Sequence, residues 1–225
     1  MPTLLALDAS TEACSCAVLH NAEVVEHYEM VPRQHTRLIL PMIDRLMATC
    51  GVRFADLDAI AFGKGPGSFT GLRIAAGVTQ GLAFAADLPV LPVSTLAAVA
   101  LQSAADDDTL VLSCLDARID EIYWGWYHVK NGAPALLGEE RLSRPEAVPA
   151  ELPFRHGQVQ IAGNGLLYRE RLSPSLLADI AVCKPELLPR SSAIVRIAAK
   201  LWQDGSTIAP ESVNPVYLRD KVTHS

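Results

Sequence analysis

Apolar and polar residues alternate in blocks along the first hundred positions, and the blocks predict a strand-rich start followed by helices. Each predicted strand is a short apolar run bounded by polar or turn residues. The first run ends in an acid, Asp8, as expected of a buried strand that reaches a polar turn. Five such runs predict strands at residues 3–8, 14–19, 24–31, 57–62 and 88–93.

From His35 onward, apolar residues recur every three or four positions, which is the spacing of one helix face. Gly51 follows this pattern and suits a helix C-cap. Pro41 lies inside the pattern, so the proline either kinks the helix or marks a later start. An apolar stripe of this width usually packs on the protein's own sheet, and contact with another protein is the alternative.

Residues 63–73 read GKGPGSFTGLR and hold four glycines and one proline. This composition excludes the interior of a helix or of a central strand. The segment follows a predicted strand and precedes a helical pattern that runs to about Ala86. A glycine loop between a strand and a helix start leaves backbone N–H groups free to bind an anion such as phosphate. A tight, closely packed turn without a ligand is the alternative.

The helix after this loop has small residues on one face. Ser68 or Thr70 is expected to cap its start, and Gly77 and Gly81 stand four residues apart. Glycine in a helix interior costs about 1 kcal/mol relative to alanine. Close approach of another backbone best explains such a pair. That backbone belongs either to a neighbouring helix of this chain or to another subunit.

The opening pattern returns after an acidic break at residues 105–108. The apolar run at 110–116 again ends in an acid, Asp116, and two further runs flank the hairpin signal Asn131-Gly132. The repeat predicts a duplicated α/β protein in which each half has a mixed sheet flanked by helices.

The two predicted subdomains are residues 1–105 and 106–225. In the second of them, apolar runs predict strands at 158–162 and 180–183. A last helix is expected to run to Trp202, capped by Ser191 or Ser192.

Composition restricts the classes of function. The formal charge of −6 and the pI near 5.5 argue against a protein that grips nucleic acid alone, so an RNA role would require a basic partner. The five cysteines lack a C-x-x-C pair and mostly lie in apolar runs, as expected of reduced thiols rather than disulfides or zinc ligands. No apolar run reaches the length of a membrane span. These features predict a cytoplasmic protein that does not enter a membrane.

Two strand-rich halves, each with an acid at the end of its first strand, resemble the ribonuclease-H-like fold of the actin, Hsp70 and sugar-kinase (ASKHA) superfamily. In that superfamily a nucleotide lies between the halves. The residues resemble the TsaB (YeaZ) family more closely. The similar segments are LDAST at 7–11, the helix start His35-Thr36, the glycine segment 63–73 and PVYLR at 215–219.

This resemblance implies a non-catalytic subunit in the bacterial synthesis of threonylcarbamoyladenosine in tRNA. The complex would transfer a threonylcarbamoyl group from its adenylate to the adenosine next to the anticodon. The chain would scaffold and activate a TsaD-type catalytic subunit. A TsaE-type ATPase subunit would dock on the assembled pair. The tRNA would bind only through the complex. Alone, the chain would form a homodimer. The resemblance places the partner interface on His35, Leu38, Met42, Leu46, Arg73, Gly77 and Gly81.

The resemblance also implies a degenerate phosphate loop without catalytic residues. The paired-histidine metal positions of the TsaD paralogue fall here on Thr95 and Val99, which cannot ligate a transition metal as imidazole does. Lys64 precedes the second glycine of the loop and so cannot serve as a P-loop lysine. We therefore expect no metal and no cofactor bound by this chain alone, while a nucleotide at the partner interface stays open. The loop residues are Asp8, Ser10, Thr11, Gly65, Gly67 and Ser68.

A self-sufficient ATP-dependent phosphotransferase or ATPase of the same superfamily is the main alternative. Its phosphate and magnesium groups would be Asp8, Ser10, Thr11, Gly65 and Gly67. Against this, a strand-end aspartate more often caps its own turn. A metallopeptidase is the weaker alternative, because the required metal ligands are missing from the sequence.

Overall fold

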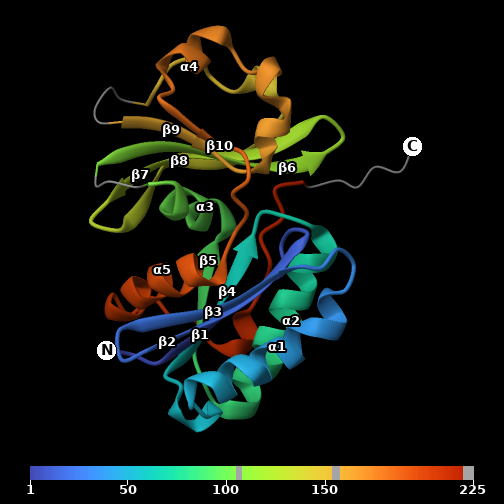
Figure 1. Ribbon diagram of the computed structural model, residues 1–225, viewed down its shortest axis with the longest axis vertical. Coiled ribbons are helices and arrows are strands. Elements are labelled where there is room, and N and C mark those ends of the chain that lie inside the picture. The colour runs from blue at the N-terminus through green and yellow to red at the C-terminus, as the bar shows by residue number, and fades with distance from the viewer. Residues whose placement is uncertain (105–107, 154–157, 220–225) are drawn as a thin grey trace. The chain divides into compact units, whose positions relative to one another are not determined.

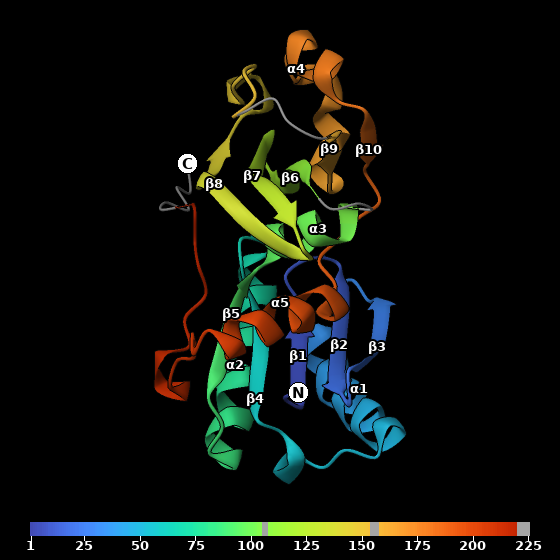
Figure 2. The same ribbon diagram turned by 90° about the vertical axis from the view of Figure 1, so that its left-hand side faces the viewer.

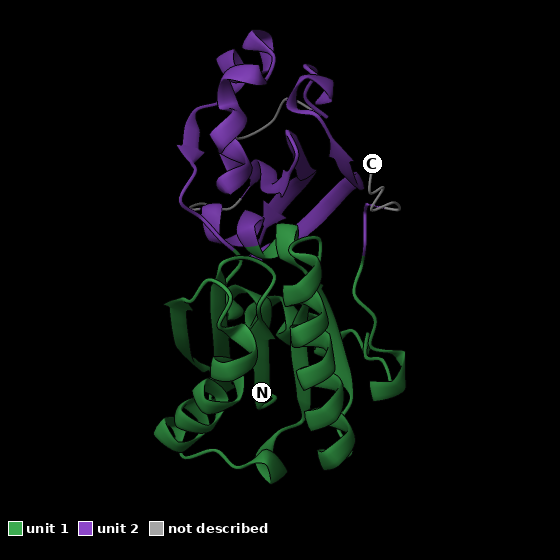
Figure 3. Cartoon of the chain, turned by 90° about the vertical axis from the view of Figure 1, so that its right-hand side faces the viewer, with its two compact units in different colours: residues 1–98, 189–216 green, residues 99–188, 217–225 purple. Residues whose placement is uncertain are grey.

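The chain forms two compact units, coloured separately in Figure 3. Residues 1–98 with 189–216 make up unit 1, and residues 99–188 with those from 217 on make up unit 2. The structure, a computed structural model, describes residues 1–104, 108–153 and 158–219. Most of the predicted acidic break, at 105–107, therefore lies outside the described residues.

The bounds of the units differ from those of the predicted subdomains because helix α5 (Ser191–Gln203) returns to unit 1. This helix packs against the strands of the first sheet through an apolar face that includes Ile194, Val195 and Ala198. The expected serine cap of α5 is wrong, since the helix is preceded by Arg190 and has no side-chain cap. The hydroxyl of Ser191 instead donates a hydrogen bond to the carbonyl oxygen of Ser15, over 2.9 Å.

Unit 1 contains a five-stranded mixed sheet in the order β3-β2-β1-β4-β5. The first three strands pair antiparallel, and β4 and β5 run parallel to β1. All five predicted strands of this half are confirmed, with ends that shift by at most three residues. The strands are β1 (Leu4–Asp8), β2 (Ala13–His20), β3 (Glu23–Met30), β4 (Ala59–Gly65) and β5 (Val90–Ser94).

Helices cover both faces of this sheet. Figures 1 and 2 show α1 (His35–Cys50) and α2 (Phe69–Ala86) on one face and α5 on the other. Helix α1 begins at His35 and continues through Pro41, so the later start is excluded, and it ends at Gly51 with φ +63° as predicted. A short helix, α3 (Thr95–Ser103), follows β5 directly.

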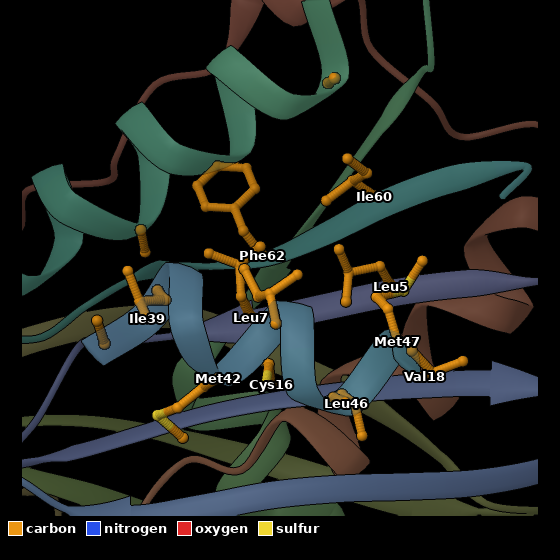
Figure 4. Close-up of a cluster of buried hydrophobic side chains, with 14 of the residues drawn as sticks. Leu5, Leu7, Cys16, Val18, Ile39, Met42, Leu46, Met47, Ile60 and Phe62 are labelled. Atoms are coloured by element: carbon orange, nitrogen blue, oxygen red, sulfur yellow. The ribbon is translucent and has the colours of Figure 1, made fainter. Parts of the chain in front are cut away.

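One hydrophobic core of unit 1 lies between the sheet and helices α1 and α2 (Figure 4). Alternate residues of the central strands point to this side, among them Leu5, Leu7 and Phe62. Helix α1 contributes Ile39, Met42, Ile43, Leu46 and Met47, whose spacing places them on one helix face. The apolar stripe of α1 is therefore a layer of the core.

Unit 2 repeats the same sheet order. Its strands are arranged β10-β9-β6-β7-β8, with β6, β7 and β8 antiparallel and β9 and β10 parallel to β6. The first strand of each unit thus lies at the centre, with its hairpin partner on one side and a parallel strand on the other. The predicted duplication and the predicted fold class, two mixed sheets flanked by helices, are both confirmed. The strands are β6 (Thr109–Arg118), β7 (Glu121–Lys130), β8 (Ala133–Ser143), β9 (Gln158–Ala162) and β10 (Val182–Lys184).

The helical elements of unit 2 are short. Between β8 and β9 the described residues include one 3-10 helix, Pro145–Ala147, and between β9 and β10 lie a 3-10 helix, Asn164–Arg171, and α4 (Pro174–Asp179). Within the described parts of both units, no helix combines the length and the apolar character that a membrane span needs.

Candidate functional site

The glycine segment joins the end of β4 to the start of α2 in unit 1. Strand β4 continues to Gly65, and α2 begins at Phe69. The hydroxyl oxygen of Ser68 accepts a hydrogen bond from the backbone N–H of Gly71 over 3.5 Å, so Ser68 is the predicted N-cap. Residues 66–68 therefore form the whole connection between strand and helix.

This connection packs directly on the turn that follows β1. The backbone N–H of Ser68 donates to the carbonyl oxygen of Ser10 over 2.7 Å. A Cβ atom on Gly67 would lie 2.5 Å from that same oxygen, and one on Gly71 would lie 1.9 Å from the carbonyl oxygen of Ala9. Glycine is needed here because a backbone segment of the same unit fills the space that a side chain would occupy.

Gly65 is covered in the same way by the C-terminal segment. The backbone N–H of Val216 donates to the carbonyl oxygen of Lys64 over 2.7 Å, and the carbonyl oxygen of Val216 would lie 2.8 Å from a Cβ on Gly65. The tight-turn interpretation accounts for each of these close approaches without a ligand.

Asp8 lies at the centre of this packing, with 1% of its surface exposed. Its Oδ1 accepts hydrogen bonds from the backbone N–H of Ser10, over 3.1 Å, and from the Ser10 hydroxyl, over 2.9 Å. Its buried Oδ2 has no partner among the described residues and would lie 2.0 Å from a Cβ on Gly63. Burial raises the pKa of Asp8 to about 7, although the hydrogen bonds from Ser10 oppose this shift.

The structure thus brings together five of the six predicted loop residues. Asp8 and Ser10 are sealed from solvent and bonded to each other, so magnesium or phosphate cannot reach them in this arrangement. Thr11 is set apart, with a hydroxyl that accepts a hydrogen bond from the N–H of Ala13 over 3.3 Å. This geometry disfavours the phosphotransferase alternative and favours a structural role for Asp8.

The two positions that correspond to metal ligands in the resembled catalytic paralogue are buried. The hydroxyl of Thr95 donates to the carbonyl oxygen of Pro66 over 2.5 Å, so it serves the packing of the glycine loop. Val99 is fully buried. Over residues 1–104, 108–153 and 158–219, no group of three or more His, Cys, Asp and Glu side chains is placed to hold a metal ion.

Three predicted interface residues of α1 are instead core residues. Met42 and Leu46 are 0% exposed, and His35 is 8% exposed with its Nε2 3.2 Å from the carbonyl oxygen of Ala13. They face the sheet of unit 1 because the helix needs its apolar side to cover β1 and β2. Leu38 is half-buried and packs on the same core. The assignment to a protein interface is therefore wrong for His35, Met42 and Leu46, and for Leu38 it stays a prediction.

Helix α2 presents the remaining predicted residues on its outer side. No described atom lies within 4 Å of a Cβ built on Gly77 or Gly81, so of the two alternatives a helix of another subunit is favoured over a neighbouring helix of this chain. The guanidinium of Arg73 lies over the Phe69 ring, 3.8 Å from its centroid. Residues 69, 73, 77 and 81 recur at every fourth position and therefore share one helix face.

Two aromatic residues of this face were not expected. Phe69 is 48% exposed and Phe84 is 64% exposed. Single exposed apolar side chains are common on protein surfaces, so these two rings carry information only as parts of one continuous helix face. Their four-residue and three-residue spacing from Arg73 and Gly81 was the available signal in the sequence. We define the α2 stripe as Phe69, Arg73, Gly77, Gly81 and Phe84.

The α2 stripe has the form that close helix packing requires. Two glycines remove the side chains that otherwise keep helix axes apart, and an aromatic residue at each end adds apolar area. A helix from another molecule can therefore approach α2 closely along its centre.

The chain is similar to proteins of threonylcarbamoyladenosine biosynthesis. The family model described as "TsaD: tRNA N6-adenosine threonylcarbamoyltransferase" matches residues 20–161. The tRNA threonylcarbamoyladenosine biosynthesis protein TsaB of Escherichia coli K12 is 40% identical, over 97% of this chain and 95% of the relative. TsaB of Haemophilus influenzae is 38% identical, over 98% and 95% of the two chains. The solved structure of YeaZ from Pseudomonas aeruginosa superposes with a TM-score of 0.90 at 43% identity, covering 97% of this chain and 100% of that one.

Proposed function

This chain belongs to the TsaB family of tRNA threonylcarbamoyladenosine biosynthesis proteins, and we propose that it serves this pathway as a non-catalytic subunit. Its partner is a TsaD-type subunit that transfers a threonylcarbamoyl group to the adenosine next to the anticodon. The chain holds that subunit in an active geometry. This work takes place in the cytoplasm, where tRNA is modified.

The observation that carries this proposal is the exposed α2 stripe. Phe69 and Phe84 are 48% and 64% exposed, and a Cβ built on Gly77 or Gly81 between them has no described atom within 4 Å. Burial of an aromatic side chain contributes about 1.5–3 kcal/mol. Both rings together can therefore supply a substantial part of the binding free energy once a helix covers the stripe.

The sealed environment of Asp8 supports a non-catalytic role. Its unpartnered Oδ2 is buried, and the hydroxyl of Ser10 is committed to its Oδ1. Thr95 and Val99 provide no metal ligand. With a formal charge of −6, the chain also lacks the cationic surplus that tRNA binding by one subunit requires, so tRNA binds through the complex.

The same stripe pairs two copies of this chain when the catalytic subunit is absent. An isologous pair through α2 would bring the small faces of two identical helices together. Homodimer and heterodimer therefore compete for one surface. A TsaE-type ATPase subunit docks as a third component on the assembled heterodimer.

The decisive experiment replaces Gly81 by leucine. Because a Cβ built on Gly81 has no described atom within 4 Å, Gly81→Leu should fold, while the new side chain blocks close approach of a partner helix. We expect pairing with the catalytic subunit, measured by isothermal titration, to weaken about tenfold or more. Ala178→Leu, at an exposed position of α4 in unit 2, is the matched control and should pair normally.

Modification of tRNA in a reconstituted mixture is the second readout. The chain alone should leave tRNA unmodified, and addition of its partners should restore modification, as detected by nucleoside mass spectrometry. If the purified chain modified tRNA unaided, or if Gly81→Leu folded and paired like the unaltered protein, the proposal would be refuted.

A further inference from the structure

Residues 206–216 of unit 1, defined here as the C-terminal strap, follow α5 and run beside α2 (Figures 2 and 3). The strap includes a short 3-10 helix, Pro210–Ser212, which packs on α2. It ends with Pro215-Val216, the first two residues of the PVYLR segment. A motif of the sequence thus lies at the end of a segment that borders the helix proposed for binding.

Backbone hydrogen bonds attach both ends of the strap to the sheet of unit 1. Near its start, Ile208 and Val90 of β5 exchange two N–H···O=C bonds, each 2.9 Å long. At its end, the N–H of Val216 donates to the carbonyl oxygen of Lys64 in β4 over 2.7 Å. The second attachment lies at the glycine segment that leads into α2, which begins at Phe69.

Between these ends the strap contacts α2 itself. The side-chain Nε2 of Gln80 donates to the carbonyl oxygen of Pro210 over 3.0 Å. Gln80 stands three residues after Gly77 and four before Phe84, so its side chain neighbours the α2 stripe. Val213, 7% exposed, belongs to the hydrophobic core that α2 shares with the sheet. The strap is therefore bonded to the helix beside its stripe and packed into the core beneath it.

Helix α2 packs on the sheet through smaller side chains than α1 does. Apart from Leu72, its buried residues are small, and its other large apolar side chains on the core are only partly buried. The buried residues of α1 include two isoleucines, two methionines and a leucine. Small side chains bury little apolar area, and the buried hydroxyl of Thr79 in α2 has no hydrogen-bond partner among the described residues. Contacts from outside α2 therefore matter for its position, and the strap supplies such contacts.

We propose that the C-terminal strap is a clamp that sets the position of α2 and thereby controls whether a partner helix can bind the α2 stripe. The inference rests on the proposed function, in which that stripe pairs with the catalytic subunit. Close packing over glycines requires the two helix axes to approach along one line, so a shift of α2 on its sheet weakens pairing. Ile208 and Val216 are positioning residues in this scheme, since they act through α2.

The test uses Val216→Pro in the full chain, which removes the N–H that binds Lys64 because proline has no backbone N–H. The amides of α2 should exchange hydrogen about five- to tenfold faster, measured by hydrogen–deuterium exchange with mass spectrometry, while those of α1 keep their rates. Affinity for the catalytic subunit, measured by isothermal titration well below the melting temperature, should fall about fivefold or more. Ile208→Pro removes a bond at the other end and should act in the same direction.

Asn214→Pro is the matched control, because it places a proline between the two attachments and removes neither. Asn214 already precedes a proline, and Val213 before it is extended, with φ −66° and ψ +111°, so both positions suit the change. The bond that it removes is an exposed one, from the Asn214 side chain to the carbonyl oxygen of Ser212 over 3.3 Å. Exchange in α2 and affinity for the catalytic subunit should both stay as in the unaltered protein.

Gln80→Leu covers the case in which a proline variant fails to fold. It removes the side-chain bond to Pro210, leaves the backbone of the strap unchanged, and should also speed exchange in α2 relative to α1. The inference is overturned if exchange rises equally in α1 and α2 of the folded variants, if α2 keeps its rates, or if affinity for the catalytic subunit stays normal. If the unaltered chain does not pair with the catalytic subunit, the proposed function fails, whereas the exchange comparison still tests whether the strap holds α2.

Discussion

The two units share one sheet topology but differ in what covers it. In unit 1 the connections after β3 and β4 carry helices of 16 and 18 residues, α1 and α2. In unit 2 the equivalent connections carry, within the described residues, a 3-10 helix of 3 residues in one and helices of 8 and 6 residues in the other. The duplicated sheet is therefore a common scaffold, and only unit 1 extends it into a long helix with an exposed, small-residue face.

The strand-end acids of the two units show the same divergence. Asp8 is sealed, has an unpartnered oxygen and has its pKa raised to about 7 by burial. Asp116 occupies the equivalent place in unit 2 but forms an ion pair with Arg118 at 3.0 Å. The equivalent strand-end aspartates thus have different surroundings, since Asp8 is buried with an unpartnered oxygen whereas Asp116 pairs with Arg118. Asp8 therefore contributes to the packing of the glycine loop in unit 1, and Asp116 holds Arg118 next to the hairpin turn in unit 2.

The largest loss of stability should come from a substitution in helix α1, which covers the sheet of unit 1 and has no long counterpart among the described residues of unit 2. Leu46→Ala removes a side chain of α1 that is 0% exposed, and the lost burial and the remaining cavity should cost about 2–5 kcal/mol in the free energy of unfolding. Leu40→Ala, on the outer side of the same helix at 47% exposure, is the control and should change stability little. Denaturant unfolding followed by circular dichroism measures both. Equal losses for the two variants would contradict the assignment of the α1 stripe to the core.

The next effect concerns pH. Because the folded-state pKa of Asp8, about 7, lies above the ordinary value of 3.8, the folded protein binds this proton more tightly than the unfolded chain. The resulting stability is fully present below about pH 3.8 and is lost as the pH rises towards 7. At about 1.36 kcal/mol per pKa unit, the loss amounts to roughly 4 kcal/mol at most.

Asp8→Asn should abolish this part of the pH dependence, because asparagine does not titrate. Unfolding free energies at several pH values between 4 and 8 measure it. Asp116→Asn, in the other unit, leaves Asp8 intact and should keep the slope of the unaltered protein over the same range. Parallel curves for Asp8→Asn and the unaltered protein would show that the proton of Asp8 is not linked to folding.

A feature that both units share should give a smaller effect. Gly71 approaches the residue after β1 and Gly163 approaches the inside of β6, and a Cβ on either would lie 1.9 Å from a backbone oxygen, that of Ala9 or of Cys114. Gly71→Ala should destabilise the protein by about 1–3 kcal/mol, since backbone rather than a flexible side chain must shift, and Gly163→Ala by more, since its φ of +108° also disfavours alanine. Thermal unfolding detects both changes. If either alanine variant were as stable as the unaltered chain, the close approach in that unit would be disproved.

The smallest change in stability is expected at a glycine that has no close neighbour in its own unit. Gly77 is such a glycine, in contrast to Gly71. Gly77→Ala introduces a methyl group that meets nothing within 4 Å and should stabilise α2 by about 0.5–1 kcal/mol. A rise in melting temperature, measured on the isolated chain below the concentration at which it pairs, checks this. A fall would indicate that some part of unit 1 already uses the space beside Gly77.

Elements carried by local patterns were predictable. The strand at 3–8, the helix start at His35, the Gly51 cap and the Ser68 cap follow from apolar periodicity and from residues whose backbone or side-chain chemistry acts within one turn. The duplicated topology also followed from the order of such elements. The candidate site was predicted only as a group of neighbours, since Asp8, Ser10 and Gly67 do come together but without an opening for a ligand.

Other properties depended on distant segments. An apolar stripe such as that of α1 looks the same whether a sheet or a partner covers it, and only the packing of β1 and β2 beneath Met42 decided between them. Gly77 has no side chain that could reveal whether a neighbour is present. The exposure of Phe84 and the positive φ of Ile119 likewise follow from the position of α2 on its sheet and from the register of β6 with β7.

The order of the elements, the duplicated sheets and the family were predictable from the sequence, because they depend on spacing and motifs along the chain. Tertiary structure alone decided which residues are sealed and which are presented to solvent. Burial is a property of pairs of segments brought together by folding, such as the Ser10 turn on the glycine loop. For this reason the loop that resembles a phosphate site is filled by its own backbone, and the surface proposed for binding lies on the helix that follows it.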